Sequence, residues 1–382
     1  MKRFYLDLTD EQQLIMNMIH EFGVNEVEPR ANAIDRSNEF PIDLFMRAAE
    51  LGFTNFVVPE EMGGAGQNEK LILLMQEELS QFSPSVGFTL NYLCNAGGIY
   101  SLMPELAAKY ADDLAAGKTV AAYAVADPAG SFNFTQHPVF AKKDGDEWVL
   151  NGTRLFVTAS GIAKLILTHG LCDDGQFRYF GVEAGTPGFE TTKIEQKVGM
   201  NGLNNGVLSY QNVRIPDSAV LPFPSVSDLC RSGYNASYLE AAATAVGGAQ
   251  GIFDKTMDYL KTRESHGITF DKMSFHADRM GRLNARIEIC RCYLHRSIED
   301  LVTHNLAPEQ GNICKAECTE MFVDVAKECL ESWGGIGMFE DTGVARYLRD
   351  AITLIPADHS NDVHYQQIAK HLGMGVTRTI CD

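Results

Sequence analysis

The sequence predicts a mainly helical protein in which a small β unit separates two helical units. Apolar residues recur with helical spacing over residues 1–119, change to the spacing of short strands over 120–222, and return to helical spacing over 223–382. Helices and strands that come in separate runs indicate segregated layers rather than an alternating βαβ sheet. At 382 residues the chain exceeds one ordinary core, which favours two or three domains.

The first helical unit begins with a capping signal. Gln12 follows Thr9 by three residues, which is the spacing of a capping box at a helix N-terminus. The apolar residues that come next share one helical face, and they are Leu14, Ile15, Met18, Ile19 and Phe22. A second helix is predicted within FPIDLFMRAAELGF, with Gly52 in the place of a C-terminal cap.

The β unit is predicted from alternating, β-rich segments. In DGDEWVLNGTRLFVT we expect a hairpin whose tight turn is Asn151-Gly152, because both residue types accept positive φ. Further short strands are predicted in KLILTHG, FRYFGVE and GVLSYQNVRIP.

Composition excludes several classes of function. The net charge of −18 and the lack of a Lys/Arg-rich run disfavour nucleic acid and anionic membranes as partners. We expect neither a signal peptide nor a membrane span, and the nine cysteines are typical of free thiols in a reducing compartment, so a cytoplasmic protein is predicted. Cys314 and Cys318 are four residues apart in a helical context, which favours two buried side chains over a metal site.

Two glycine-containing motifs do not indicate nucleotide binding. AAGKT at residues 115–119 lacks the first glycine of a phosphate-binding loop, and no strand is predicted before it. GGIG at residues 334–337 follows a predicted helix rather than a strand, which argues against a Rossmann fingerprint.

Five segments in register carry a resemblance to a known family. They are AYAVADPAGS, LNGTRLFVTASG, RESHG, WGGIG and YLRDA, and together they resemble the acyl-CoA dehydrogenase family of flavoproteins from about residue 8 to residue 375. The resemblance implies an N-terminal helical domain, a central β-barrel or sheet domain and a C-terminal four-helix bundle. It also implies FAD between the last two domains, an acyl-CoA substrate, electron-transferring flavoprotein as electron partner, and a homodimer or homotetramer in which two chains contribute cofactor groups.

One set of cofactor residues is implied in the β unit. The family's pyrophosphate-binding serine corresponds to Ser131 if one missing glycine is accepted, whereas its flavin-binding threonine is replaced by Ala126. Phe156 and Thr158 take the places of the aromatic wall of the flavin ring and of the threonine beside flavin N5. Without the resemblance, Ser131 is as well explained by turn capping and Phe156 by core packing.

A second set is implied in the C-terminal unit. Arg263 matches the arginine that reaches the FAD pyrophosphate of a neighbouring subunit, for which a planar guanidinium is well suited. Gly334 and Gly335 match glycines whose backbone approaches the cofactor. The departures from the family pattern are His266, Ser274 and Glu331.

The segment LIPADHSNDVHY holds the candidate catalytic residue. Counting from the Arg-Asp-Ala run, Asp358 stands in the family's catalytic glutamate position, and His359 and Ser360 stand where glycine and threonine follow it. Ser360 is therefore a candidate cofactor contact. His359 stands where the family has a small residue, so it is expected to narrow the substrate-binding site or to add a proton-transfer group. A carboxylate is what the chemistry needs, because a base must remove the acidic α-proton of the thioester while a β-hydride goes to flavin.

Other interpretations of this segment stay open. Asp358 can be a solvated or capping acid in a chain that has changed or lost the family reaction. A metal site of Asp358, His359, Asp362 and His364 is disfavoured, because residues 358 and 359 do not share a helical face.

Some family members carry the base early in the C-terminal domain. The corresponding residue here is Ser237, which cannot serve as a base, so Glu240, one turn later, is the backup candidate. Tyr238 occupies a position often filled by arginine and is a candidate substrate contact. In the β unit KVGMNGLNN departs from the family's G-x-R-x-S, which predicts an unusual substrate pocket.

The resulting prediction is an FAD-dependent oxidoreductase that interconverts an acyl-CoA thioester and its 2,3-enoyl form, with Asp358 as base. Two alternatives are a non-redox, lyase-like acyl-CoA enzyme on the same fold and a non-catalytic subunit of a hetero-oligomeric dehydrogenase.

Overall fold

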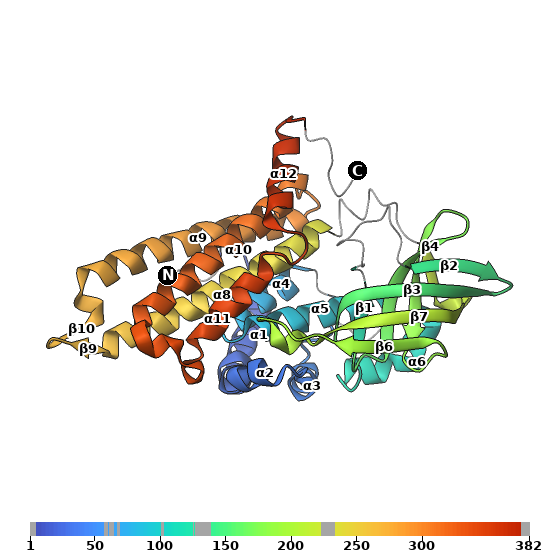
Figure 1. Ribbon diagram of the computed structural model, residues 1–382, viewed down its shortest axis with the longest axis horizontal. Helices are drawn as coiled ribbons and strands as arrows, with labels where there is room; N and C mark the ends of the chain where they lie inside the picture. Colours follow the sequence, from blue (N-terminus) through green and yellow to red (C-terminus); the bar gives the residue numbers. More distant parts are fainter. Residues whose placement is uncertain are drawn as a thin grey trace.

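The computed structural model describes residues 5–56, 60, 65–66, 69–100, 103–124, 126, 139–222 and 234–375. The predicted order of helices, strands and helices is confirmed (Figure 1). The α-helices of the N-terminal unit are α1 Asp10–Phe22, α2 Ala31–Ser37, α3 Ile42–Glu50, α4 Glu69–Ser80, α5 Pro84–Tyr100 and α6 Pro104–Ala115. Within the described ranges, every helix lacks the length or the apolar character that crossing a bilayer requires.

Local signals at the first helices act as predicted. The Thr9 hydroxyl accepts a hydrogen bond from the Gln12 amide at 3.1 Å, and the Gln12 side chain accepts one from the Thr9 amide at 3.2 Å, which completes the capping box. Helix α3 ends just before Gly52, which has a φ of +79° that a residue with a side chain rarely adopts. Capping therefore fixes these helix ends without help from distant residues.

The strands form one mixed sheet. They are β1 Ala121–Ala124, β2 Val139–Asp144, β3 Glu147–Thr158, β4 Leu165–Cys172, β5 Phe177–Glu183, β6 Phe189–Ile194, β7 Asn205–Pro216 and β8 Val220–Pro222. Their order in the sheet is β6-β7-β3-β2-β4-β5-β8, and β1 pairs with β4 in parallel. The three short strands that were predicted after residue 163 correspond to β4, β5 and β7.

The prediction of a tight turn at Asn151-Gly152 is wrong. Strand β3 runs through both residues, and the hairpin turn lies at Gly145-Asp146, between the paired residues Asp144 and Glu147. Gly145 has a φ of +63° in the first central position, where glycine is favoured in two-residue turns. Gly152 instead lies in β3 opposite a β-bulge of β7, which has one extra residue between Tyr210 and Val213.

The C-terminal unit is a bundle of long helices. It contains α8 Tyr234–Thr262, α9 Ser274–Val302, α10 Pro308–Trp333, α11 Val344–Leu354 and α12 Asn361–His371, with the short strands β9 Glu264–Ser265 and β10 Ile268–Thr269. Helices α8 to α11 lie side by side, and α10 contacts each of the others (Figure 1). The predicted helical bundle is thereby confirmed. Cys314 and Cys318 are buried in it, and the described residues contain no group of His, Cys, Asp and Glu side chains arranged to hold a metal.

Helix α8 packs closely against α4, which connects the bundle to the N-terminal helices. A Cβ atom built at Gly247 would lie 2.0 Å from the carbonyl oxygen of Glu77, and one at Gly251 would lie 1.9 Å from that of Gln81. These contacts involve backbone atoms that cannot rotate away. Glycine at both positions is therefore a condition for the close approach of the two helices.

Gly251→Ala is expected to destabilise the fold by about 1–3 kcal/mol, because the added methyl group forces α8 away from the end of α4. The measurement is the free energy of unfolding in urea at fixed protein concentration. Gly281→Ala in α9 is the matched control: nothing lies within 4 Å of its Cβ position, so alanine should stabilise by about 0.5–1 kcal/mol. Equal effects at the two sites would contradict this account.

Candidate active site

The turn between α11 and α12 carries Asp358 and lies against the start of α8 and against α10. Helix α11 ends at Leu354, and α12 begins at Asn361. Asp358 has a φ of +49° and His359 a φ of +81°, so two successive residues with side chains adopt the left-handed conformation. Each such residue costs roughly 1–2 kcal/mol. A turn of this kind persists only where the surrounding structure holds it.

The Asp358 carboxylate faces protein rather than water. Its Oδ2 atom is buried and has no hydrogen-bond partner among the described residues, and Ser237 of α8 donates a hydrogen bond to the carboxylate. Burial raises the pKa of Asp358 above its ordinary value, and the Ser237 hydrogen bond and the Lys315 charge oppose part of that shift. A carboxylate with a raised pKa is a stronger base than an exposed aspartate.

The backup candidate lies in the same region. Burial is the main cause of a raised pKa at Tyr92 of α5, and the carboxylates of Glu240 and Asp358 add to it, which places both acids near the Tyr92 hydroxyl. That hydroxyl accepts a hydrogen bond from the backbone amide of Tyr123 in β1 at 2.8 Å. Tyr92 therefore connects the candidate bases with the β unit.

The substrate-side candidates Tyr238 and His359 are neighbours of Asp358. Both are buried, and the Tyr238 hydroxyl lies 3.3 Å from His359 Nδ1. The Tyr238 ring also meets the His364 ring edge-on, with centroids 4.5 Å apart. Burial is the main cause that lowers the pKa of His364 to about 3, so this imidazole is neutral at physiological pH. Its Nε2 atom lies 3.1 Å from the backbone oxygen of Asp358 and helps to hold the turn.

The flavin-side candidates lie at the end of β3. Phe156 has a φ of +54° and is 62% exposed, an unusual combination for a large apolar side chain. Thr158 is buried, and Asn205 of β7 donates to the Phe156 carbonyl oxygen at 2.7 Å and to the Thr158 hydroxyl oxygen at 3.1 Å. Because the hydroxyl oxygen accepts from Asn205, its hydrogen is available to another acceptor.

The other cofactor candidates are not at this place. Arg263 follows the last residue of α8, while Tyr238 is near its start, so at about 1.5 Å per residue they lie roughly 38 Å apart. Gly334 is at the same end as Arg263, because Trp333 stacks on Tyr259 with ring centroids 4.1 Å apart. The structure therefore does not bring Arg263, Gly334 and Gly335 to Asp358 within one chain.

Two further candidates complete the set. Ser360 is the N-cap residue of α12, with a φ of −68° and no side-chain capping hydrogen bond. Ser131 lies outside the described residues.

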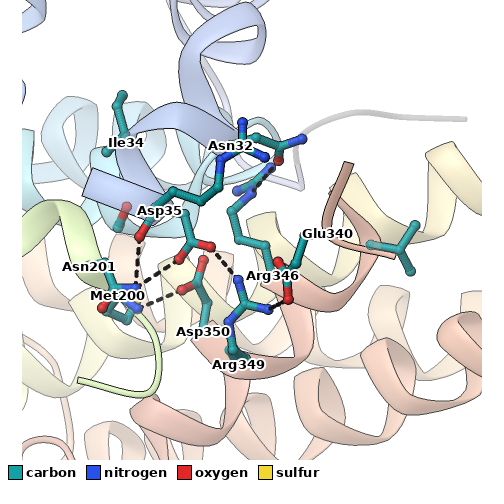
Figure 2. A network of polar contacts seen from close by, with 12 residues as sticks. Asn32, Ile34, Asp35, Met200, Asn201, Glu340, Arg346, Arg349 and Asp350 are labelled. Atoms are coloured by element: carbon teal, nitrogen blue, oxygen red, sulfur yellow. Dashed lines mark hydrogen bonds and ion pairs between the residues drawn. The ribbon is translucent and has the colours of Figure 1, made fainter. Parts of the chain in front are cut away.

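A polar network fastens the segment after β6 to both helical units (Figure 2). The backbone amide of Met200 donates to the Asp350 carboxylate at 2.6 Å, and Asn201 donates to the Asp35 carboxylate at 3.0 Å. Arg349 of α11 pairs with Asp35 of α2. Burial is the main cause that raises the pKa of Asp350 to about 6. Because α11 leads into the Asp358 turn, this network holds the helix from which that turn begins.

The residues that replace the family's G-x-R-x-S belong to this junction. A Cβ atom at Gly199 would lie 2.3 Å from the backbone oxygen of Arg349, so glycine is required for the contact with α11. Asn201 bonds both the backbone and the side chain of Asp35. Their observed contacts are thus structural ones between the β unit and the helices.

Sequence reasoning missed three polar residues of the site. Ser237 is predicted to be unable to act as a base, and in the structure it bonds the Asp358 carboxylate. Asn205 and Lys315 have no predicted role. Lys315 carried a usable signal, because it shares helical spacing with the apolar residues Cys318 and Phe322 and is therefore placed on a buried face.

Comparison with known proteins shows similarity along nearly the whole chain. Residues 9–118, 122–213 and 231–373 match the N-terminal, middle and C-terminal domains of acyl-CoA dehydrogenases, respectively. The sequence is similar to an acyl-CoA dehydrogenase of Bacillus subtilis (strain 168), with 28% identity over 377 residues that cover 96% of this chain and 99% of the relative.

Solved structures show the same fold. The chain is similar to butyryl-CoA dehydrogenase from Megasphaera elsdenii, with a TM-score of 0.89 and 23% identity, covering 97% of this chain and 100% of that one. It is also similar to a chain in a structure of the electron-transferring flavoprotein of Acidaminococcus fermentans, with a TM-score of 0.89 and 24% identity, covering 96% and 99% of the two chains. At these identities the likeness establishes the fold.

Proposed function

Because this chain belongs to the acyl-CoA dehydrogenase family and is a flavoenzyme of the type that acts on CH–CH bonds with FAD, we propose that Asp358 is its catalytic base. The proposed reaction is the interconversion of an acyl-CoA thioester and its 2,3-enoyl form. The observation that carries the proposal is the Asp358 carboxylate. Its Oδ2 atom is buried without a hydrogen-bond partner, and its pKa is raised. A raised pKa and an oxygen without a hydrogen-bond partner suit the role of general base.

The residues present fit an FAD group. The exposed face of Phe156 offers an aromatic wall, and the Thr158 hydroxyl has a hydrogen to donate. Nothing lies within 4 Å of the positions where Gly334 and Gly335 would carry Cβ atoms, which leaves room for a backbone approach to a ligand. Arg263 is exposed and forms no ion pair within the described part of the chain, so its guanidinium is available for phosphate.

Several residues of the chain have separate roles in the proposed reaction. When bound, FAD supplies an acceptor for the hydride that leaves the β-carbon. Asp358 takes the α-proton, and it holds that proton more readily than an exposed aspartate because burial raises its pKa. Ser237 orients the carboxylate through its hydrogen bond, and Tyr238 of α8 meets His359 of the turn beside it.

A homo-oligomer is part of the proposal. Arg263, Gly334 and Gly335 lie at the far end of the bundle from Asp358, which supports a second copy as their source for a site that contains Phe156 and Thr158. We also propose an acyl-CoA substrate, an electron-transferring flavoprotein as electron partner and a cytoplasmic location. The location is supported by the free thiols of the described cysteines, which are typical of reducing compartments.

The decisive experiment uses the purified protein under anaerobic conditions. Its visible spectrum is recorded before and after addition of saturated acyl-CoA thioesters of different chain shape. Bleaching of the flavin band together with formation of the enoyl product is the expected result. Product without bleaching would support the non-redox alternative instead. A colourless protein that acquires FAD only with a second polypeptide would identify it as a subunit of a hetero-oligomer.

Phe156→Gly is expected to weaken FAD retention without lowering the stability of the apoprotein. The side chain is 62% exposed, so little packing is lost, and glycine adopts its φ of +54° without cost. The measurements are the FAD-to-protein ratio after gel filtration and the unfolding free energy of the FAD-free protein. Ile289→Ala, which removes a 70% exposed apolar side chain from α9, should change neither quantity. Full FAD retention in Phe156→Gly would remove Phe156 from the cofactor site.

A further inference from the structure

A buried lysine holds the Asp358 turn from the neighbouring helix. Lys315 lies in α10 and is completely inaccessible to solvent. Its Nζ atom donates to the backbone oxygen of Ile355 at 2.7 Å, to that of His359 at 2.9 Å and to Asn361 Oδ1 at 2.7 Å. An ammonium group has three N–H donors, so every donor of Lys315 has an acceptor.

The three acceptors bracket Asp358 along the chain. Ile355 comes before it, His359 directly after it, and Asn361 is the first residue of α12. The turn between them contains two left-handed residues that the backbone itself disfavours. Contacts from outside the turn must therefore maintain its shape, and Lys315 supplies contacts on both sides of the carboxylate-bearing residue.

The ammonium is also an electrostatic partner of the site. Its charge lowers the pKa of Asp358 against the larger raising effect of burial. In return, Asp358 and Glu320 favour the charged form of Lys315, while burial is the main effect and lowers its pKa to about 8. Other titratable groups around the turn are His359 within it, His364 in α12, and Tyr238 and Glu240 in α8. The Lys315 charge helps to keep His364 neutral.

We propose that Lys315 is the positioning residue of this active site: its protonated side chain fixes the turn so that the Asp358 carboxylate reaches the substrate α-carbon. This inference rests on the proposed role of Asp358. Deprotonation would leave two N–H donors for three acceptors and turn a lone pair toward an oxygen atom. The turn would then loosen, and proton abstraction would slow as the pH rises through the pKa of Lys315, although the substrate and FAD sites remain formed.

The test compares Lys315→Met with the wild-type holoenzyme. Methionine matches the length of the aliphatic stem but lacks charge and donors. We expect kcat to fall on the order of 100-fold, as a displacement of about 1 Å in a reacting group produces, with KM and FAD content changed little. The primary isotope effect with α-deuterated acyl-CoA should rise, because proton abstraction becomes slower. The alkaline limb of the kcat profile, expected near pH 8 in the wild type, should disappear.

Two further variants make the outcome unambiguous. Lys315→Arg keeps the charge but does not titrate in this range, so its alkaline limb should also disappear, and it can be measured even if Lys315→Met fails to fold. Lys327→Met removes an exposed lysine from the same helix and should leave the kcat profile unchanged. An alkaline limb that persists in Lys315→Arg, or wild-type kcat in Lys315→Met, would overturn the proposal. Activity that survives Asp358→Asn would instead overturn the underlying role of Asp358 as base.

Discussion

Asp358→Asn is expected to lower kcat by about 10²–10⁴-fold while FAD remains bound, because general-base catalysis by a positioned side chain contributes that much. Asparagine has nearly the same shape and can still accept the hydrogen bond from Ser237. It cannot take a proton. The loss should therefore fall on the chemical step, and anaerobic stopped-flow measurement of flavin bleaching should show it directly.

The same substitution should not weaken the fold at neutral pH. Burial raises the pKa of Asp358 above its value in the unfolded chain, so the folded state disfavours the ionised carboxylate. Stability therefore falls as the pH rises through that interval, and the carboxylate is destabilising at pH 7. Removing the charge should leave the unfolding free energy unchanged or raise it, which distinguishes a functional acid from a structural one.

Two comparisons complete this experiment. Asp362→Asn, in the exposed first turn of α12, should retain wild-type kcat. Glu240→Gln tests the other acid near Tyr92. If Glu240→Gln abolished bleaching while Asp358→Asn did not, the role of base would pass to Glu240.

Glu77→Ala is expected to destabilise the fold by about 3 kcal/mol, near the lower end of the range for breaking a buried ion pair. Glu77 lies in α4 and is buried, with Oε1 2.9 Å from Arg291 Nε and Oε2 2.7 Å from His295 Nε2. Both partners belong to α9, so the pair joins the N-terminal helices to the bundle. Truncation of Glu77 leaves the Arg291 guanidinium buried. Glu288 remains as its ionic partner, which limits the loss of stability.

The stabilisation by Glu77 should depend on pH in a defined direction. Burial by itself raises the pKa of Glu77, but His295 and Arg291 more than offset this and lower it to about 2 from the ordinary 4.5. Because the folded pKa is the lower one, the contribution is complete above about pH 4.5 and is lost as the pH falls toward 2. The difference in unfolding free energy between wild type and Glu77→Ala should therefore shrink with acidification.

The control for this prediction is an ion pair of similar length on the surface. Asp324 pairs with Arg286 at 2.8 Å, and both side chains are largely exposed. Asp324→Ala should cost less than about 1 kcal/mol, because water and salt screen exposed pairs. A loss at Glu77 no larger than the loss at Asp324 would show that the buried pair does not stabilise the contact between α4 and α9.

Local patterns predicted much of the fold because their physical causes are local. Thr9 and Gln12 cap a helix through hydrogen bonds within four residues, so the capping box could be inferred from the sequence. Asn151-Gly152 shows the limit of this reasoning. The same residue pair suits a tight turn or an extended strand, and pairing with β2 and β7 keeps it within β3. The division of the chain at residues 119 and 222 stays a prediction.

The candidate site was predictable in its residue types but not in its arrangement. Asp358 could be found by counting from the Arg-Asp-Ala run, and its neighbours Tyr238 and His359 by the same register. Whether that carboxylate faces water or protein depends on α8 and α10, which lie far away in the sequence. The contact between Ser237 and Asp358, 121 positions along the chain, illustrates this dependence.

By itself the sequence determined the order of helices and strands, the family and the identity of the candidate acid, since these follow from periodicity, capping and motif register. Only the tertiary structure decided that Lys315 is buried against the Asp358 turn and that Arg263 lies at the opposite end of the bundle. The physical reason is that pKa, reach and backbone restraint arise between segments distant in sequence. Burial of a charge has no meaning until those segments pack together.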